Sequence, residues 1–205
     1  MTATPAPTRV RPPGRPSTGA RERILEGALD VLKRDGYAGM TTAKVAAESG
    51  QNKGLIAYHF GSKQGLVAAV ARRVSEVLIA EVLEEVGEPG SAEELVRGLT
   101  TGVWTVIDRD PGIQRVYFDL ASQSVVEPQV SEIMADTKVS FRATLTELMR
   151  GLDDPPPADR LEAAAVYLVA GIEGLALEHL DRGATPALEH ARRIFEATAP
   201  EAIRV

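Results

Sequence analysis

Apolar residues recur at helical spacing along almost the whole chain, and glycine or proline ends each run. The first run contains Ile24, Ala28, Val31 and Leu32, and Gly36 follows it. Residues three or four positions apart share one face of an α-helix, so such a run predicts a helix that buries one side. No segment of strand length gives a convincing strand pattern of alternating apolar and polar residues. The sequence therefore predicts an all-α fold.

Capping residues and helix breakers set the expected limits of nine helices. Ser, Thr, Asn or Asp stands before several apolar runs, where its side chain can accept a hydrogen bond from a free amide of the first turn. The expected helices span residues 20–36, 42–49, 52–60, 62–86, 91–108, 110–122, 128–150, 159–180 and 186–197. We expect the long helix over 62–86 to connect two parts of the chain rigidly.

Charge is divided unevenly along the 205 residues. Residues 1–75 carry 12 Lys and Arg against 5 Asp and Glu, whereas residues 76–205 carry 11 against 24. The first part is therefore basic, with a net charge of +7, and the second is acidic, with −13. This asymmetry indicates that only the first part meets a polyanion, because the acidic part would be repelled from one.

Several classes of function are disfavoured by what the sequence lacks. The chain has no cysteine, which excludes disulfides and thiolate metal sites. Residues 1–20 contain no apolar core segment and the run 163–172 is too short to span a bilayer, so we expect a cytoplasmic protein without a membrane partner. His179 and His190 fit no common zinc spacing, and no catalytic motif is found, so we expect no metal, no cofactor and no enzyme activity.

The segment SGQNKGLIAYHFGSK, residues 49–63, carries the main functional signal. Two short helices joined by Gly50, with a longer helix before them, predict a helix-turn-helix unit whose second short helix enters the major groove of DNA. Its first turn presents Gln51, Asn52 and Lys53, which suit base edges, and Gly54 lets the backbone come close. The expected phosphate contacts come from Thr42, Tyr58, His59 and Lys63.

Residues 21–67, RERILEGALDVLKRDGYAGMTTAKVAAESGQNKGLIAYHFGSKQGLV, resemble the DNA-binding domain of the tetracycline-repressor-type (TetR) family of transcriptional regulators. The resemblance implies the same base and phosphate contacts. Ala57 stands where many members have an aromatic residue, and Leu55 stands where a small polar residue is frequent. Both side chains can instead touch thymine methyl groups, so the operator sequence is left open.

The first residues offer a second route to DNA. Residues 1–19 are rich in Pro, Thr and Arg, and we expect a flexible basic arm there, followed by a helix-turn-helix domain (20–66) and a ligand-binding and dimerisation domain (67–205). The run Pro13-Gly14-Arg15-Pro16 resembles part of an AT-hook, so Arg9, Arg11 and Arg15 are candidates for the minor groove. The alternative is a tail that adds only nonspecific attraction to DNA.

The family resemblance implies a homodimer and a small-molecule effector for the C-terminal bundle. Small residues in the helix over 159–180, together with the last helix, are the expected dimer face. The candidate pocket residues are Trp104, Tyr117, Phe118, Phe141, Tyr167 and Glu173, and further polar candidates are Gln114, Asp119, Gln123 and Arg142.

The resulting hypothesis is a homodimeric repressor that an effector releases from a palindromic operator on double-stranded DNA. Three alternatives stay open at this point: an architectural DNA-binding protein without an effector, a transcriptional activator, and a helical enzyme or ligand carrier with a vestigial DNA-binding unit.

Overall fold

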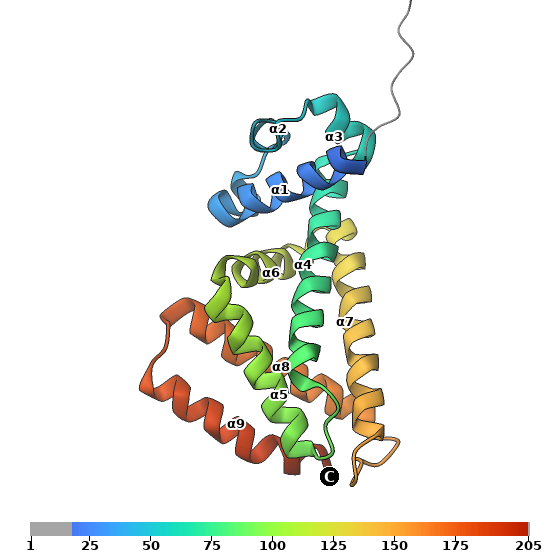
Figure 1. The fold of residues 1–205 in the computed structure, drawn as a ribbon, viewed down its shortest axis with the longest axis vertical. Helices are drawn as coiled ribbons and strands as arrows, with labels where there is room; N and C mark the ends of the chain where they lie inside the picture. The colour runs from blue at the N-terminus through green and yellow to red at the C-terminus, as the bar shows by residue number, and fades with distance from the viewer. Residues whose placement is uncertain (1–17, 205) are drawn as a thin grey trace, which may run out of the picture.

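The computed structural model describes residues 18–204, and within that range the chain forms nine α-helices and no β-strand (Figure 1). The all-α prediction is confirmed. The helices are α1 (Thr18–Gly39), α2 (Thr42–Ser49), α3 (Lys53–Phe60), α4 (Lys63–Val86), α5 (Ala92–Arg109), α6 (Pro111–Gln123), α7 (Pro128–Arg150), α8 (Leu161–Arg182) and α9 (Pro186–Arg204). Arg9, Arg11 and Arg15 of the expected arm lie outside the described residues.

Local capping explains why the early helices begin where they do. Thr41, Asn52 and Ser62 precede α2, α3 and α4 in extended backbone conformations. Each side chain accepts a hydrogen bond from the amide three residues later, at 3.2, 2.9 and 3.0 Å. These caps satisfy amides that the first helical turn leaves without a partner, which is why the sequence predicted these three starts correctly.

Three helices differ from the expected limits. α1 bends at Gly36 and continues to Gly39, and α8 begins at Leu161 rather than at residue 159. α9 runs on to Arg204 instead of ending near residue 197, although Pro200 lies inside it. Proline costs a helix one hydrogen bond, but Ala199, Pro200 and Ile203 are buried, so packing holds the last turns in place.

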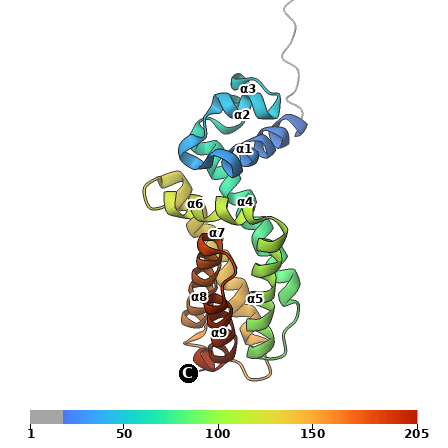
Figure 2. The ribbon, with the colours of Figure 1, turned by 90° about the vertical axis from the view of Figure 1, so that its left-hand side faces the viewer.

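The molecule has a small unit of α1, α2 and α3 at one end and a longer bundle of the remaining helices (Figures 1 and 2). α4 runs from the small unit into the bundle and packs against α1, α5 and α7. One apolar core joins α1 and the first half of α4 to α6 and the start of α7, and a second fills the space among α5, α7, α8 and α9. The expected domain boundary at residues 66 and 67 falls inside α4 and stays a prediction.

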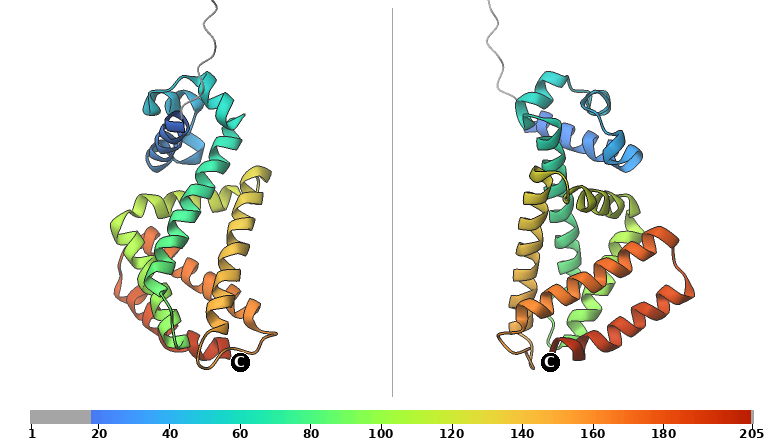
Figure 3. Two further views of the ribbon diagram at one scale, coloured as in Figure 1. Left: turned by 45° about the vertical axis from the view of Figure 1, so that its right-hand side comes forward. Right: turned by 180° about the vertical axis from the view of Figure 1, so that it is seen from behind.

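The last two helices form an outer layer of the bundle, which Figure 3 shows from behind. α8 packs against α5 and α7, and α9 packs against α5 and α8. α8 is long and apolar enough to cross a membrane by length and composition, but those criteria also fit a core helix. Its buried side contributes Ala165, Leu168 and Ala176 to the apolar core.

Asp110 stabilises the junction of α5 and α6, and its removal gives a first testable prediction. Its carboxylate accepts hydrogen bonds from the Gly112 amide at 3.1 Å, the Ile113 amide at 3.3 Å and the Lys33 ammonium at 2.6 Å. Asp110→Ala should lower the free energy of unfolding at pH 7 by about 1 to 2 kcal/mol, since it removes a helix cap and a partly exposed ion pair. Urea denaturation measures this difference.

The pH dependence of that difference follows from the same contacts. Burial alone would raise the pKa of Asp110, but Lys33 and the two helix amides outweigh it and hold the pKa below its usual value. A group with a lowered folded pKa stabilises above its unfolded pKa, about 3.9 for Asp, and loses that contribution as the pH falls through the folded value. The difference between wild type and Asp110→Ala should therefore shrink below about pH 4. A difference that widens there would contradict the assignment.

Candidate DNA interface and ligand cavity

The turn between α2 and α3 sets the direction of α3. Gly50 adopts a left-handed backbone conformation with φ 64° and ψ 21°, which residues with a Cβ rarely adopt. The chain then reverses within two residues, and α3 begins at Lys53. Ile56 is fully buried against the core of the small unit, and Phe60 packs on it one turn later. This anchoring points the opposite side of α3 away from the protein.

The outward side of α3 carries most of the residues that were expected to contact DNA. Lys53, Gly54 and Tyr58 are exposed, and the Tyr58 side chain keeps 69% of its surface accessible. Thr42 is half-buried at the first position of α2, where the first amides that the Thr41 cap does not use are available to a phosphate. The Lys53 ammonium and the Tyr58 hydroxyl of α3 and the N-terminus of α2 therefore all lie at the end of the molecule farthest from α9 (Figure 1).

Two of the expected base-contact residues also have local structural roles. The Asn52 Oδ1 atom caps α3, so the side-chain NH₂ group is the part left for a base. A Cβ on Gly54 would approach that same oxygen to 3.1 Å, so glycine also leaves room for the cap. The Gln51 side-chain nitrogen donates to the carbonyl of Gly50 at 3.2 Å. Asn52 must therefore contact a base through its NH₂ group while its Oδ1 atom continues to cap α3.

The His59 and Lys63 side chains make contacts within the protein that the sequence did not predict. The His59 Nε2 atom is buried and finds no hydrogen-bond partner among residues 18–204. The Lys63 ammonium lies 4.7 Å from the centre of the Tyr37 ring and donates to the Tyr37 carbonyl at 3.5 Å. Lys63 thus ties the start of α4 to the end of α1, and its expected phosphate contact stays a prediction.

Arg21 is a further candidate that the sequence did not single out. Its guanidinium lies 5.5 Å from the centre of the Phe60 ring, which places a cation of α1 beside the end of α3. The sequence did not reveal this contact, because Arg21 and Phe60 are 39 positions apart in the chain and come close only through the packing of α1 on α3.

α6 connects the small unit to the bundle through polar contacts at the end of α1. The backbone amide of Tyr37 donates to Asp119 at 2.7 Å, and the Tyr37 hydroxyl donates to Glu127 at 3.0 Å. Burial and the Glu127 carboxylate raise the pKa of the Tyr37 phenol, so it stays a donor. Asp119 was expected as a polar group of the ligand pocket, but it accepts the hydrogen bond from the Tyr37 amide instead.

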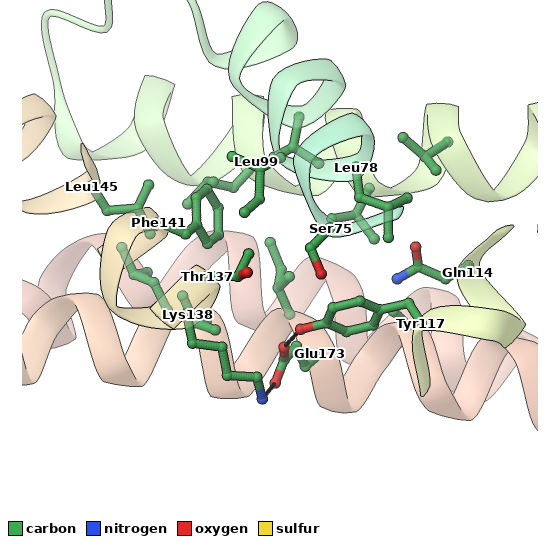
Figure 4. A pocket seen from close by; sticks show the side chains of 18 of the residues that line it. Ser75, Leu78, Leu99, Gln114, Tyr117, Thr137, Lys138, Phe141, Leu145 and Glu173 are labelled. Atoms are coloured by element: carbon green, nitrogen blue, oxygen red, sulfur yellow. Dashed lines mark hydrogen bonds and ion pairs between the residues drawn. The ribbon is translucent and has the colours of Figure 1, made fainter. Parts of the chain in front are cut away.

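A largely apolar cavity lies inside the bundle, walled by α4, α5, α6, α7 and α8 (Figure 4). The space open to the centre of a water molecule is about 70 Å³. Leu78, Leu99, Val103, Leu145 and Ile172 are among its apolar lining residues. Cavities of this kind between helices of a bundle are common ligand sites.

Polar groups gather along one side of the cavity. The Tyr117 hydroxyl donates to Glu173 at 2.5 Å, and the Lys138 ammonium donates to the same carboxylate at 3.1 Å (Figure 4). Burial and the Glu173 carboxylate raise the pKa of Tyr117 well above its usual value, and the charge of Arg142 opposes that rise. Tyr117 is therefore a protonated donor at neutral pH.

The structure brings only some of the expected pocket residues together. Tyr117, Phe141, Glu173 and Gln114 line the cavity, as do Ser75, Thr137 and Lys138, which the sequence analysis did not select. Trp104, Phe118 and Tyr167 do not line it, which corrects the expectation for these three.

The three aromatic residues outside the cavity have other neighbours. The centre of the Trp104 ring lies 5.8 Å from that of the His179 ring and 5.7 Å from the Arg192 guanidinium. Tyr167 stands on the outer side of α8, with its ring centre 6.2 Å from that of Phe195. Phe118 packs against the core of the bundle. Rotation of each helix about its axis decides which aromatic side chains face the cavity, and composition alone does not reveal it.

Comparison with known families identifies the chain. Residues 24–70 match the family model of bacterial regulatory proteins of the tetR family. Residues 92–203 match the C-terminal model of BetI-type transcriptional repressors, and this match alone spans more than half of the chain. The chain belongs to the TetR family of transcriptional regulators. The resemblance seen in the sequence is confirmed, and TetR-family regulators bind DNA and small-molecule ligands.

Individual relatives are distant in sequence and close in fold. The transcriptional regulator BetI of Escherichia coli strain K12 is 24% identical over 157 residues, which cover 76% of this chain and 79% of BetI. A transcriptional regulator from Rhodococcus sp. Rha1 superposes with a TM-score of 0.74 at 24% identity, over 90% of this chain and 98% of that one. The multidrug binding protein EbrR, solved with ethidium, has a TM-score of 0.67 at 22% identity, over 87% and 97%.

Proposed function

We propose that this TetR-family regulator is a cytoplasmic homodimeric repressor that a small-molecule effector releases from a palindromic operator. The observation that carries the proposal is the position of α6. Gln114 and Tyr117 of α6 line the cavity, while Asp119 of the same helix holds the backbone of Tyr37 at the end of α1. One rigid helix therefore contacts both the expected ligand and the expected DNA-binding unit.

Release of DNA follows from this connection. An effector that enters the cavity must compete with the contact between Tyr117 and Glu173, or push against the side of α6 that carries Gln114 and Tyr117. A shift of α6 then acts on Tyr37 and, through it, on Lys63 at the start of α4. Coupling of about 1 to 3 kcal/mol between the two sites is enough for such control.

The dimer is supported by an apolar side of α8 that the subunit leaves uncovered. Val166, Tyr167 and Leu177 are 42%, 41% and 51% exposed, and Ile194 of the neighbouring helix α9 is 50% exposed. A Cβ at Gly174 would meet no atom within 4 Å, so the centre of this side is open to a second subunit. Two copies of α3 in such a dimer would read half-sites about 34 to 36 Å apart, or a multiple of that spacing.

The proposal can be tested with DNA selected from the host genome by the purified full-length protein. The shared motif of the selected fragments should be an inverted repeat, and fluorescence anisotropy on that duplex should show saturable release by at least one small molecule. A single unpaired motif, or binding with no preference over random DNA at moderate salt, would contradict the proposal. Reporter expression that falls when the gene is deleted would point to an activator.

Lys53→Ala provides a test of the DNA interface itself. Loss of this exposed cation at the start of α3 should weaken binding to the selected duplex by about tenfold, because one phosphate or guanine contact disappears. If the contact is to a phosphate, the slope of log affinity against log salt should fall by about 1. Arg150→Ala is the matched control, since it removes one exposed cation from the far end of α7. Equal weakening by both variants would mean that only net charge matters.

A further inference from the structure

The two charged residues that line the cavity neutralise each other. The Lys138 ammonium lies 3.1 Å from one carboxylate oxygen of Glu173, and the other oxygen accepts the hydrogen bond of the Tyr117 hydroxyl (Figure 4). Both charged side chains stay partly exposed. A charged ligand would find no unpaired counterion among the lining residues, and it would have to break this ion pair to obtain one, which leaves the displaced charge without a partner.

Gln114 is a polar residue of the cavity wall whose side chain is not paired. It is only 7% exposed, and Figure 4 shows its amide directed into the cavity. Among residues 18–204 this side chain has no hydrogen-bond partner. A carboxamide that is withdrawn from water without partners is costly, and most buried polar groups in proteins are hydrogen-bonded. The unpaired amide therefore points to a partner that a ligand supplies.

The rest of the wall sets the size and polarity of that ligand. The buried Ser75 hydroxyl donates to the Met134 sulfur at 3.8 Å, and a thioether is a weak acceptor. Leu78, Val103 and Ile172 are among the apolar residues around these groups. The space open to the centre of a water molecule, about 70 Å³, is several times what one water needs. A short apolar chain with one polar end matches this lining.

We propose that the effector is a small uncharged molecule, with an apolar chain in the cavity and one hydroxyl or amide group hydrogen-bonded to Gln114. The inference rests on the proposed effector-binding role of this cavity. A carboxamide both donates and accepts hydrogen bonds, as do hydroxyl and amide groups, so the two are complementary. The apolar walls withdraw the rest of the ligand from water.

The position of Gln114 links this contact to the DNA-binding unit. Gln114 belongs to α6, and Asp119 of the same helix accepts the hydrogen bond from the Tyr37 amide at the end of α1. A ligand that binds the Gln114 amide therefore acts directly on the helix that contacts the DNA-binding unit.

Four molecules of the same chain length separate the ligand classes: hexanamide, 1-hexanol, hexanoate and hexylammonium. Isothermal titration of each into the full-length protein at pH 7.5 should show both uncharged compounds binding at least about tenfold more tightly than either ion, because the ions lose their hydration without gaining a counterion. Equal affinities for all four compounds, or tighter binding of either ion, would overturn the proposal.

Gln114→Met tests the hydrogen bond itself. The substitution keeps the length of the side chain and removes the amide, so hexanamide should bind about tenfold more weakly, since its polar group then stays unpaired. The melting temperature of the ligand-free variant should not fall, because the lost amide had no partner within the subunit. Gln123→Met is the matched control, since it makes the same change on α6 at a residue that does not line the cavity. Gln114→Leu removes the amide with a different shape, and undiminished hexanamide binding in either folded Gln114 variant would overturn the proposal.

A parallel titration against the selected duplex separates this inference from the proposed function. Release of DNA by hexanamide or 1-hexanol supports both. Release by hexanoate or hexylammonium alone overturns the uncharged class and leaves the effector-controlled regulator intact. Binding of the uncharged compounds through Gln114 without release of DNA supports the ligand class and contradicts control through α6. Failure of all four compounds to bind overturns the uncharged class, while specific binding to the duplex is scored separately.

Discussion

Ala170→Arg is expected to convert the dimer into a monomer and to weaken binding to the selected inverted repeat by on the order of 100-fold, because a monomer reads only one half-site. Ala170 is exposed on α8, between Tyr167 and Gly174 in the helical repeat. An arginine there would place a charge in the middle of the proposed dimer face, where no partner of opposite charge is expected. An unpaired charge in an apolar contact is far less favourable than an alanine.

The subunit itself should tolerate this change. Since position 170 points away from the core, the free energy of unfolding of a monomer should change by less than about 0.5 kcal/mol. Ala143→Arg is the matched control, because Ala143 is exposed on α7 and outside the proposed face. Sedimentation velocity measures the assembly state and fluorescence anisotropy the affinity for the duplex. A dimeric Ala170→Arg variant would contradict the assignment of α8 as the dimer face.

The parts of the fold that the sequence predicted are those with local causes. Thr41, Asn52 and Ser62 cap helices through atoms three residues away, and Gly50 permits the turn by its own conformational freedom. No distant residue is needed for any of these effects, so reading along the chain was sufficient. The end of α9 was misplaced because packing of Ala199 and Ile203 overrides the local effect of Pro200.

The cavity was harder to predict because its wall is assembled from five helices. Glu173 was selected because an acid within an apolar helix needs a partner, and it has two, Tyr117 and Lys138. Lys138 itself was not selected, since one lysine on a polar helix carries no signal in the sequence. Trp104 and Tyr167 were selected for their residue type, yet α5 and α8 turn them away from the cavity. Helix rotation is a property of tertiary packing, which periodicity alone does not fix.

Gly65→Ala is expected to lower the free energy of unfolding by about 2 to 3 kcal/mol, which is the cost of forcing an extra methyl group into a packed site. A glycine inside a helix would ordinarily be replaced by alanine with a gain of up to about 1 kcal/mol. At this position a Cβ would come far inside van der Waals contact with the carbonyl oxygen of Phe60. That atom belongs to the backbone and cannot rotate away, so the clash outweighs the gain in helix propensity.

The clash at position 65 should also weaken DNA binding. Phe60 ends α3 and Gly65 lies in the first turn of α4, so relief of the contact requires these two helices to move apart. We expect affinity for the selected duplex to fall by about tenfold or more at a temperature where the variant is fully folded, since misplaced base contacts are lost. Circular dichroism establishes the folded range, and anisotropy gives the affinity. Gln64→Ala, one residue earlier, removes atoms without adding any at this contact and should leave both quantities nearly unchanged. If the Gly65→Ala protein is as stable as the wild type, position 65 has room for a methyl group. That result would contradict the close packing of Gly65 in α4 against the Phe60 carbonyl at the end of α3.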